Sequence, residues 1–324
     1  MNKRQGCAAA RVGEMWNMAS MADTPVRTDM DEDSARQTRA LIRFVDPGDF
    51  VTRRYVSSGK EMNTGTYSDH EVTLRDGMPI RDHFKLDVHG FMLGKNPSAV
   101  RDFHDKAQVD ALYEREVEEH IRQLTGASKV FARGWMIRTS ADLSQRAQEK
   151  VEGYAHTGGI QPPAGEAHVD LNEATARRMA EMTYAQKCPD GPGFKRFLIS
   201  SYWRTFSPPP QDVPLAVCDG RTSFGGEEKS NTLFIVDDFP SEEEAVKPVP
   251  GEEGMMAASI FSHNPDMRWW YFSNMQADDV LFFKFYDSDH SVTWRSPHTA
   301  FRDSSFADAN IRESIECRSV AFWE

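Results

Sequence analysis

The stretch Val280-Leu-Phe-Phe-Lys-Phe-Tyr286 belongs to a series of short apolar segments in the second half of the chain. Segments of five to eight apolar and aromatic residues, separated by turn and loop sequences, are typical of β-strands. The series comprises residues 197–203, 232–236, 256–261, 268–272, 280–286 and 311–322. Many short strands joined by long loops favour a β-sandwich or jelly roll. We therefore expect a mainly β chain with flanking helices, of the α+β class.

One clear helical pattern precedes these strands. Between Val109 and Leu124 apolar residues recur at steps of three and four, glutamates occupy the opposite face, and Gly126 is placed to end the helix. This pattern predicts a supporting helix over about 105–125, followed by the β core over about 129–322. Asn172 is placed to cap a shorter helix over 174–185.

The remaining segments suggest one domain behind a leader. Residues 1–38 are polar and have no periodicity, so we expect a flexible N-terminal leader, with residues 39–324 forming a single domain. Residues 140–166 are also polar and end in Gln161-Pro-Pro-Ala-Gly165. We interpret them as a loop that acts as a lid.

The overall charge limits the partners of this protein. The 324 residues include 38 Lys and Arg against 50 Asp and Glu, a net charge of −12. This balance argues against nucleic acid and against an anionic membrane surface, and no apolar run reaches the roughly 18–20 residues of a membrane span. A small-molecule partner is the expectation that remains. The oligomeric state is left open, with a homodimer among the possibilities.

The cysteines and the N-terminus indicate a cytoplasmic protein. Cys7, Cys188, Cys218 and Cys317 show neither metal-binding nor redox spacing, and the first twenty residues lack the apolar core of a secretory signal. Reduced thiols are the simplest interpretation. Motifs of hydrolases and nucleotide-binding proteins, such as G-x-S-x-G, H-E-x-x-H and G-x-G-x-x-G, are absent from the sequence.

The tripeptide His168-Val169-Asp170 is the strongest candidate for chemistry. On an extended strand residues i and i+2 point to the same face, so the imidazole and the carboxylate converge. His298, in Ser296-Pro-His298, offers a third ligand from a strand that can lie alongside in a jelly roll. Two histidines and one carboxylate on one face of a metal form the site of non-haem Fe(II) oxygenases. The alternative is a surface histidine beside a solvated aspartate.

A basic residue beyond His298 would complete such a site. An oxygenase that uses 2-oxoglutarate must neutralise its distal carboxylate in a dry pocket, which arginine does with two parallel hydrogen bonds. Arg312 follows His298 by fourteen residues, and Arg318 shares its strand face roughly 20 Å further along. We favour Arg312 and keep Arg318 as the alternative. A surface arginine paired with a nearby glutamate remains the simpler interpretation.

Several motifs together resemble a known family when taken in order. They are Leu86-Asp-Val-His-Gly-Phe91, Gly126-Ala-Ser128, His168-Val-Asp170, Tyr202-Trp-Arg204, Pro214-Leu-Ala-Val-Cys-Asp219, Trp270-Tyr-Phe272, Leu281-Phe-Phe-Lys-Phe-Tyr-Asp-Ser288, Pro297-His-Thr-Ala-Phe301 and Arg312-Glu-Ser-Ile-Glu316. This ordered set, from about residue 72 to 322, resembles the hydroxylase/desaturase family of fungal and bacterial natural-product pathways, which includes the gibberellin desaturase and cephamycin methoxylation types.

The resemblance implies a fold, cofactors and a reaction class. The implied fold has a double-stranded β-helix (jelly roll, cupin-like) core, and the implied cofactors are Fe(II), with 2-oxoglutarate and O₂ as cosubstrates. It places the metal on His168, Asp170 and His298. The implied reaction is hydroxylation, desaturation or oxidative cyclisation of a small natural product, with release of succinate and CO₂. The chain departs from the family pattern at Trp135-Met-Ile-Arg138 and at Leu171-Asn172, and residues 1–38 have no counterpart.

Further residues are candidates for substrate contact or for support of the site. Arg138 and Arg204 could bind a carboxylate, or could be buried structural arginines. Trp203, Trp270 and Tyr286 could wall a substrate pocket, although aromatic residues on such strands commonly form core. Tyr202 is a further candidate for substrate contact or support.

Other polar residues close to these strands have a plainer interpretation. We expect Asp287 and Asp289 to lie in a solvated turn rather than to orient a ligand. His263 and His290 are expected to be exposed loop residues.

Two other classes of protein are compatible with the same sequence. One is a non-catalytic, cupin-like protein that binds a small molecule or a metal, and the other is a structural β domain whose His-x-Asp is accidental. Iron binding and formation of succinate from 2-oxoglutarate would separate the oxygenase from both.

Overall fold

The computed structural model describes residues 32, 35–57, 60–143, 149–151, 154–156, 159–304 and 308–324. Most of the predicted leader lies outside these residues. Strand β1 (Gln37–Val45) begins at the last two positions that we assigned to the leader.

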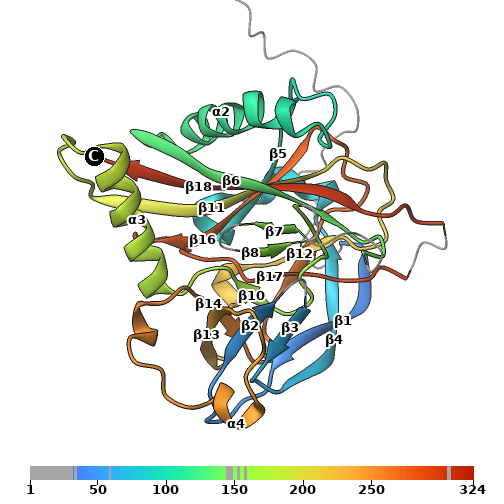
Figure 1. Ribbon diagram of the computed structural model, residues 1–324. Helices are drawn as coiled ribbons and strands as arrows, with labels where there is room; N and C mark the ends of the chain where they lie inside the picture. Colours follow the sequence, from blue (N-terminus) through green and yellow to red (C-terminus); the bar gives the residue numbers. More distant parts are fainter. Residues whose placement is uncertain are drawn as a thin grey trace, which may run out of the picture.

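Two sheets make up the main body of the described chain (Figure 1). The larger sheet has the order β1, β4 (Tyr67–Asp76), β15 (Trp269–Tyr271), β12 (Leu215–Cys218), β17 (His298–Ala300), β10 (His168–Val169), β14 (Ala257–Phe261), β13 (Glu228–Ile235), β2 (Arg53–Ser57) and β3 (Lys60–Asn63). The second has the order β5 (Phe91–Lys95), β16 (Asp279–Asp287), β11 (Arg196–Thr205), β18 (Glu313–Trp323), β6 (Lys129–Thr139) and β9 (Ile160–Gln161). Both sheets are mixed, because β13 with β2, β15 with β4, and β6 with β9 run parallel.

The predicted mainly β class is confirmed, and each of the six predicted strands is present within a few residues. They are β11, β13, β14, β15, β16 and β18. The strand that we expected at His298 is β17, whereas the sequence did not reveal β12, which at four residues is too short to show a period of two. Residues 140–166 are not only loop, since they include β9 and the backbone hairpin of β7 (Glu149–Val151) and β8 (Tyr154–His156).

Helices flank the second sheet. The predicted supporting helix is α2 (Lys106–Thr125), which begins where the Asp105 side chain accepts from the Gln108 amide and ends at Gly126 with φ +68°. The predicted cap at Asn172 is also present, because its side chain accepts from the Thr175 amide, 2.9 Å away, at the start of α3 (Glu173–Lys187). The other helices are short: α1 (Leu86–His89), α4 (Glu242–Ala245), and the 3₁₀ turns η2 (Met78–His83), η3 (Gly220–Thr222) and η4 (Glu252–Gly254).

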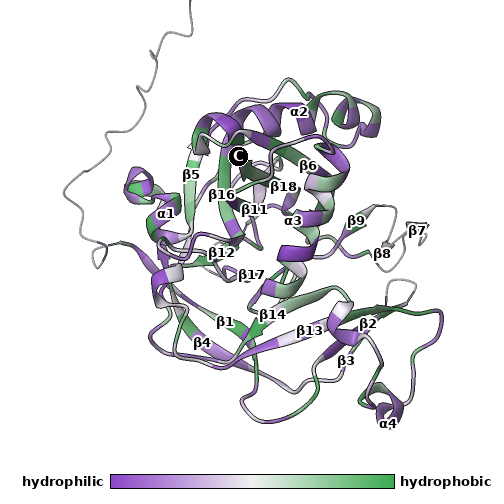
Figure 2. Ribbon diagram, turned by 90° about the vertical axis from the view of Figure 1, so that its left-hand side faces the viewer, coloured by the Kyte–Doolittle hydropathy of each residue, from purple (hydrophilic) through white to green (hydrophobic). Residues whose placement is uncertain are grey.

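Two apolar clusters explain how these layers are held together. One fills the space between the sheets, where Phe283 and Phe285 of β16 reach the His298 ring of β17, with centroids 4.7 and 5.5 Å apart. The other lies between the six-stranded sheet and α2, whose buried face includes Val109 and Tyr113. Helix α2 crosses the upper side of that sheet in Figures 1 and 2. The six-stranded sheet is therefore buried on both faces over much of its area.

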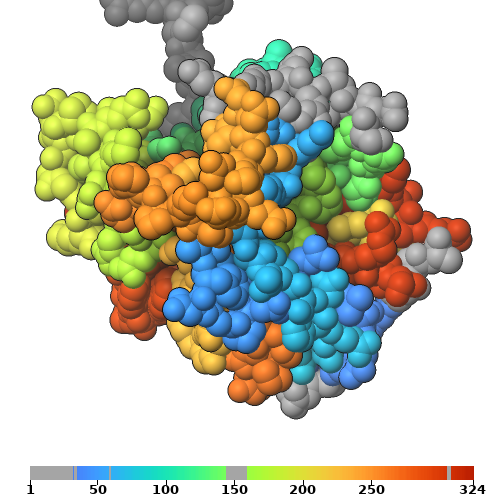
Figure 3. Space-filling model, turned by 60° about the horizontal axis from the view of Figure 1, so that its bottom comes forward, coloured from blue at the N-terminus to red at the C-terminus, as the bar shows by residue number. Residues whose placement is uncertain are grey.

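The N-terminal strands are fixed to a distant part of the chain. Arg53 of β2 is buried and donates to the carbonyl oxygens of Ala245 (2.6 Å) and Lys247 (2.7 Å), and it pairs with Glu252. In Figure 3 the blue N-terminal strands accordingly lie beside the orange segment that contains α4. These bonds attach the segment that contains α4 to β2 of the larger sheet.

A buried ion cluster corrects one expectation. Asp287, predicted to lie in a solvated turn, is fully buried at the end of β16, where it accepts from Lys284 Nζ (2.7 Å) and Arg196 Nη2 (2.6 Å). Lys284 is also fully buried and reaches Asp87 Oδ1 at 2.7 Å. Burial forces these charges to pair, because an unpaired charge in the interior is costly.

This cluster gives a stability prediction. Lys284→Met removes one partner of a buried carboxylate and should lower the free energy of unfolding by about 3 kcal/mol. Urea denaturation at pH 7 would measure the change. Lys95→Met is the matched control, because Lys95 is exposed and lies 3.9 Å from Asp279. A loss no greater than that of the control would contradict the structural importance of the cluster.

Candidate metal centre

Two neighbouring strands near the middle of the larger sheet bring the predicted ligands together. Strands β10 and β17 are antiparallel, and His168 is directly paired with His298 across them. Asp170 follows the last residue of β10. The two histidines are thus adjacent in space. The same pairing brings Asp170 and His298 together, although these two residues are 128 positions apart along the chain. This is the strand neighbourhood that the sequence led us to expect.

The three side chains converge on one point. The Asp170 Oδ1 atom lies 3.3 Å from His168 Nε2 and 3.2 Å from His298 Nε2. One ligand atom from each residue lies within 4.8 Å of the others, and all three side chains are largely buried. Two imidazole nitrogens and one carboxylate oxygen in this arrangement fit a divalent transition metal that keeps open coordination positions.

Backbone carbonyls set the orientation of both imidazoles. The Nδ1 atom of His168 lies 2.7 Å from the carbonyl oxygen of Glu166, and the Nδ1 atom of His298 lies 3.3 Å from that of Ser296. Each carbonyl precedes its histidine by two residues. A carbonyl can only accept, so Nδ1 carries a proton in each ring, which leaves Nε2 as the nitrogen that can bind a metal. The backbone therefore turns the Nε2 atom of each ring toward the point at which a metal would be held.

The electrostatics of the cluster also suit a cation. Burial alone would raise the pKa of Asp170, but Arg318 and the two histidines hold it well below its usual value. Burial lowers the pKa of His298, and His168 lowers it further. The carboxylate is consequently ionised, and His298 is neutral at pH 7.

The two candidate arginines have different surroundings. Arg318 forms an ion pair with Asp170 Oδ2 and donates through Nε to Glu316 Oε1 at 3.1 Å. Arg312 is almost fully buried, and its Nε and Nη2 atoms have no hydrogen-bond partner among the described residues. Burial lowers the pKa of Arg312 to about 9, and the nearby Arg138 adds to this shift. Arg312 is therefore a buried cation whose donors fit an anion from outside the chain.

Two cavities lie at this centre. The smaller one contacts all three predicted ligands and is also lined by Arg312 and Trp203. The larger one has a volume of about 250 Å³ and shares His168 and Asp170 with the smaller. Residues 160–166, the end of the segment interpreted as a lid, form part of the larger cavity wall. The arrangement provides a small anion pocket next to the ligand set and a wider chamber beside it.

The structure brings only some of the other predicted residues to these cavities. Arg138 lines both cavities and donates to the Pro162 carbonyl oxygen at 3.0 Å. Trp203 lines the smaller cavity, where the guanidinium carbon of Arg312 lies 5.7 Å from the centroid of its ring. Tyr202 and Arg204 lie elsewhere. Successive residues of a strand point to opposite faces, so these two neighbours of Trp203 face α2 instead.

The contacts of the excluded residues show what they do. The hydroxyl of Tyr202 is 2.6 Å from both Asn96 Nδ2 and His120 Nδ1, and Arg204 donates to the Tyr113 hydroxyl at 3.1 Å. Tyr286 stacks on Phe197 and lies outside the lining of both cavities. These three side chains therefore have packing contacts outside the two cavities.

The two isolated histidines have structural contacts. His290 is exposed, as expected, and stacks on Trp294 at 4.7 Å between centroids. His263 is only partly exposed, because it stacks on His70 at 4.2 Å.

Sequence reasoning missed several residues of the cavity wall. Arg54 of β2, Glu61 of β3 and Glu166 before β10 all line the larger cavity. Arg54 and Glu61 lie more than 100 residues before the His-x-Asp motif and carry no motif of their own. Glu166 could have been found from its place two residues before His168, since alternate residues of an extended segment share a face.

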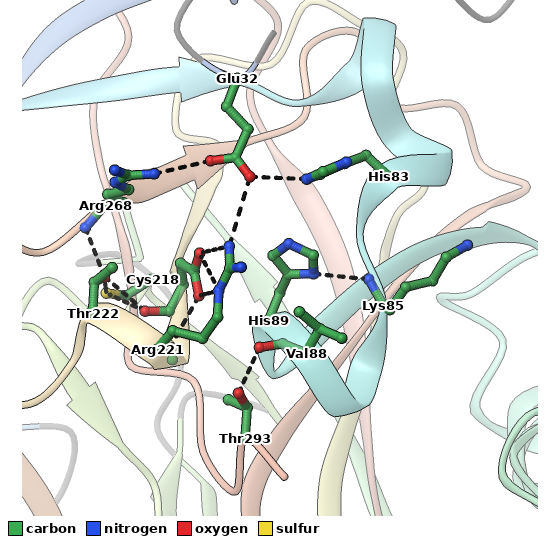
Figure 4. Close-up of polar contacts among 12 residues, drawn as sticks. Glu32, His83, Lys85, Val88, His89, Cys218, Arg221, Thr222, Arg268 and Thr293 are labelled. Atoms are coloured by element: carbon green, nitrogen blue, oxygen red, sulfur yellow. Dashed lines mark hydrogen bonds and ion pairs between the residues drawn. The ribbon is translucent and has the colours of Figure 1, made fainter. Parts of the chain in front are cut away.

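A second group of metal-binding residue types lies among Glu32, His83 and His89. Figure 4 shows the Glu32 carboxylate between His83, Arg221 and Arg268. Its oxygens lie 2.8 Å from His83 Nε2 and 3.1 Å from Arg268 Nη1. The Nδ1 atom of buried His89 accepts from the Lys85 amide at 3.0 Å, so Nε2 carries the proton and offers no lone pair to a metal. With two arginines close by, this group is an ion-pair cluster rather than a metal site.

The Glu32 cluster gives a pH-dependent prediction. Burial would raise the pKa of Glu32, but His83, Arg221 and Arg268 lower it below its usual value. The carboxylate therefore stabilises the folded state above about pH 4.5, and this contribution is lost as the pH falls through the lowered pKa. Glu32→Gln should cost up to about 1 kcal/mol at pH 7 and less at pH 3, as measured by urea denaturation. An equal loss at both pH values would contradict an ionic role.

Comparison with known proteins identifies the class to which this fold and site belong. A family model described as oxidoreductase/YMDC permease-like domain (YDMC) matches residues 43–322. The hydroxylase/desaturase CTB9 of Cercospora beticola is 30% identical over 263 residues, which cover 80% of this chain and 78% of CTB9. The hydroxylase/desaturase efuI of Hormonema carpetanum is 28% identical over 261 residues, which cover 80% of this chain and 85% of efuI.

A solved structure extends this similarity to the fold. The iron and alpha-ketoglutarate-dependent endoperoxidase NvfI matches with a TM-score of 0.69 and 25% identity, covering 89% of this chain and 98% of that chain. In sequence, the Fe(II)/2-oxoglutarate-dependent dioxygenase nvfI of Aspergillus novofumigatus is 29% identical over 272 residues, which cover 82% of this chain and 87% of nvfI. The chain belongs to the hydroxylase/desaturase family of Fe(II)/2-oxoglutarate-dependent dioxygenases, which confirms the family resemblance.

Over the part of the chain that the structure describes, no helix is both long and apolar enough to cross a membrane.

Proposed function

We propose that this protein oxidises a C–H bond of a small natural-product substrate, by hydroxylation, desaturation or oxidative ring closure. The observation that carries the proposal is the convergence of His168, Asp170 and His298 beside the buried Arg312, whose Nε and Nη2 atoms have no hydrogen-bond partner among the described residues. Bound Fe(II) and 2-oxoglutarate would supply the activation of O₂, with release of succinate and CO₂.

Each residue of the centre has a distinct task in this proposal. His168, Asp170 and His298 hold the metal, and the carbonyls of Glu166 and Ser296 keep the imidazoles in place. Arg312 binds the distal carboxylate of 2-oxoglutarate through Nε and Nη2. Trp203 and Phe283 close the smaller cavity and exclude water from it.

The same proposal covers the organisation of the chain. We infer that residues 39–324 form one domain with a double-stranded β-helix core, and that the segment 140–166 acts as a lid over the larger cavity. The core shared between the two sheets supports a single folding unit. The wall that residues 160–166 contribute to the larger cavity supports their role as a lid.

One experiment tests the function directly. Protein freed of metal is loaded anaerobically with Fe(II) and 2-oxoglutarate, exposed to O₂, and assayed for succinate. Succinate should form slowly without substrate and faster with a natural product that fits the larger cavity. A protein that binds neither iron nor 2-oxoglutarate would favour the non-catalytic alternative.

A further inference from the structure

We propose that the substrate is an uncharged, largely apolar molecule that carries a hydroxyl group, and that Arg54 and Asn231 bind this hydroxyl. The inference rests on the proposed function, because it concerns the cavity beside the proposed metal centre. It follows from the balance of charge around the cavities and from two unpartnered polar atoms in the wall.

Every arginine of the larger cavity faces a carboxylate. Arg54 pairs with Glu61 and lies 4.0 Å from Glu166. Arg138 lies 3.6 Å from Glu316, which also accepts from Arg318. These arginines are thus already neutralised within the wall.

The charges of the two cavities balance as a whole. Arg54, Arg138 and Arg318 line the larger cavity together with Glu61, Glu166 and Asp170. The smaller cavity adds one further arginine, Arg312, and one further carboxylate, Glu316. Fe(II) and doubly ionised 2-oxoglutarate also cancel in charge. An ionised substrate would therefore enter a space that offers no net opposite charge, which is unfavourable in a desolvated site.

Three adjacent strands give the larger cavity its apolar character. Strands β14, β13 and β2 lie side by side in the larger sheet (Figure 1). Each presents two residues that are two positions apart and so share a face. The three pairs are Ala258 and Ile260, Asn231 and Leu233, and Arg54 and Val56. Four of these six side chains are apolar, so this wall suits a hydrocarbon skeleton.

The other two side chains of the same wall provide one donor and one acceptor. Arg54 Nε and Asn231 Oδ1 are both buried and have no hydrogen-bond partner among the described residues. A guanidinium N–H can only donate, and an amide oxygen can only accept. Arg54 is paired with Leu233 across the two strands, so Asn231 lies diagonally beside it on the same face. A hydroxyl group both accepts and donates and so matches this donor and this acceptor, whereas a ketone or an ether oxygen leaves the Asn231 oxygen without a donor.

The experiment compares three ligands with one carbon skeleton. A bicyclic C15 hydrocarbon, its alcohol and the matching carboxylic acid are titrated anaerobically against protein loaded with 2-oxoglutarate and redox-inert Mn(II), with tryptophan fluorescence as the readout. The alcohol should bind at least about tenfold more tightly than the hydrocarbon or the acid, as expected for hydrogen bonds to buried polar groups. Asn231→Leu should remove the preference for the alcohol over the hydrocarbon.

A charge variant tests the balance independently. Glu61→Gln leaves the charge of Arg54 partly uncompensated and should raise the affinity of the acid relative to the alcohol by roughly fivefold. Glu71→Gln is the matched control, since Glu71 pairs with Arg39 at an exposed position outside the cavity lining. Glu71→Gln should leave the affinity of the acid relative to that of the alcohol unchanged.

The outcomes separate this inference from the proposed function. Binding of Mn(II) and 2-oxoglutarate is measured first by thermal shift, and its absence would contradict the proposed function. If both bind, the inference is overturned when the acid binds as tightly as the alcohol or when the alcohol does not bind. It is also overturned when Glu61→Gln leaves the affinity of the acid relative to that of the alcohol unchanged.

Discussion

His298→Ala is expected to lower the affinity for Fe(II) by more than about 100-fold and to abolish succinate formation. Even groups that only support metal ligands cost about 10- to 100-fold when removed, and this change removes a ligand itself. His298 is also the only one of the three ligands contributed by β17, so the remaining two cannot enclose the metal from both strands. Anaerobic titration of Fe(II), followed by the succinate assay, measures both effects.

The chain offers a matched control in the same connection between strands. His290 is exposed, precedes β17 by a few residues, and stacks on Trp294 rather than on the centre. His290→Ala should leave the iron affinity within about twofold of the original protein, since it changes no group near the metal. Full iron binding by His298→Ala would remove His298 from the site.

Arg312→Met is expected to have opposite effects on ligand binding and on stability. Loss of charge-assisted hydrogen bonds of about 1.5–3 kcal/mol should raise the KM for 2-oxoglutarate by roughly 10- to 100-fold. Without 2-oxoglutarate the same change removes a buried cation whose Nε and Nη2 atoms lack partners in the described structure. Replacing such a charge with an apolar side chain of similar length should leave the Tm unchanged or raise it.

This combination distinguishes a binding arginine from a structural one. Replacement of a structural arginine would lower the Tm. The KM for 2-oxoglutarate would then change only through loss of folded protein. Arg302→Met is the control, because the Arg302 side chain is 73% exposed and lies between His298 and Arg312 in sequence. It should change neither quantity. An unchanged KM in Arg312→Met would transfer the assignment to Arg318.

Much of this architecture could be predicted from local sequence patterns. The strands that became β11 and β16 are long enough to show continuous apolar residues, and α2 repeats over five turns with recognisable ends. The His168 and Asp170 pair was predictable because the alternation of a strand alone places both side chains on one face. Each of these features depends on residues that are near one another in the chain.

Other features depend on which strands become neighbours. Tyr202 and Arg204 were candidates because they flank Trp203, but only the packing of α2 decides which face of β11 is turned away from the cavity. Arg54 reaches the cavity because β2 joins β13 in a parallel pair, a contact across about 180 residues that no local pattern records. The burial of Asp287 likewise depends on Arg196, on the adjacent strand.

The carbonyls that orient His168 and His298 have a consequence for the choice of metal. Both rings are oriented by backbone carbonyls two residues before them, so the protein backbone itself directs the two Nε2 atoms toward one point. A rigid pair of imidazoles with one carboxylate accepts several divalent ions, and intrinsic affinity rises from Mn²⁺ through Fe²⁺ to Cu²⁺. Nickel or zinc could therefore displace iron and inhibit the enzyme. Correct metalation would depend on the metals that the cell supplies rather than on selection by the protein.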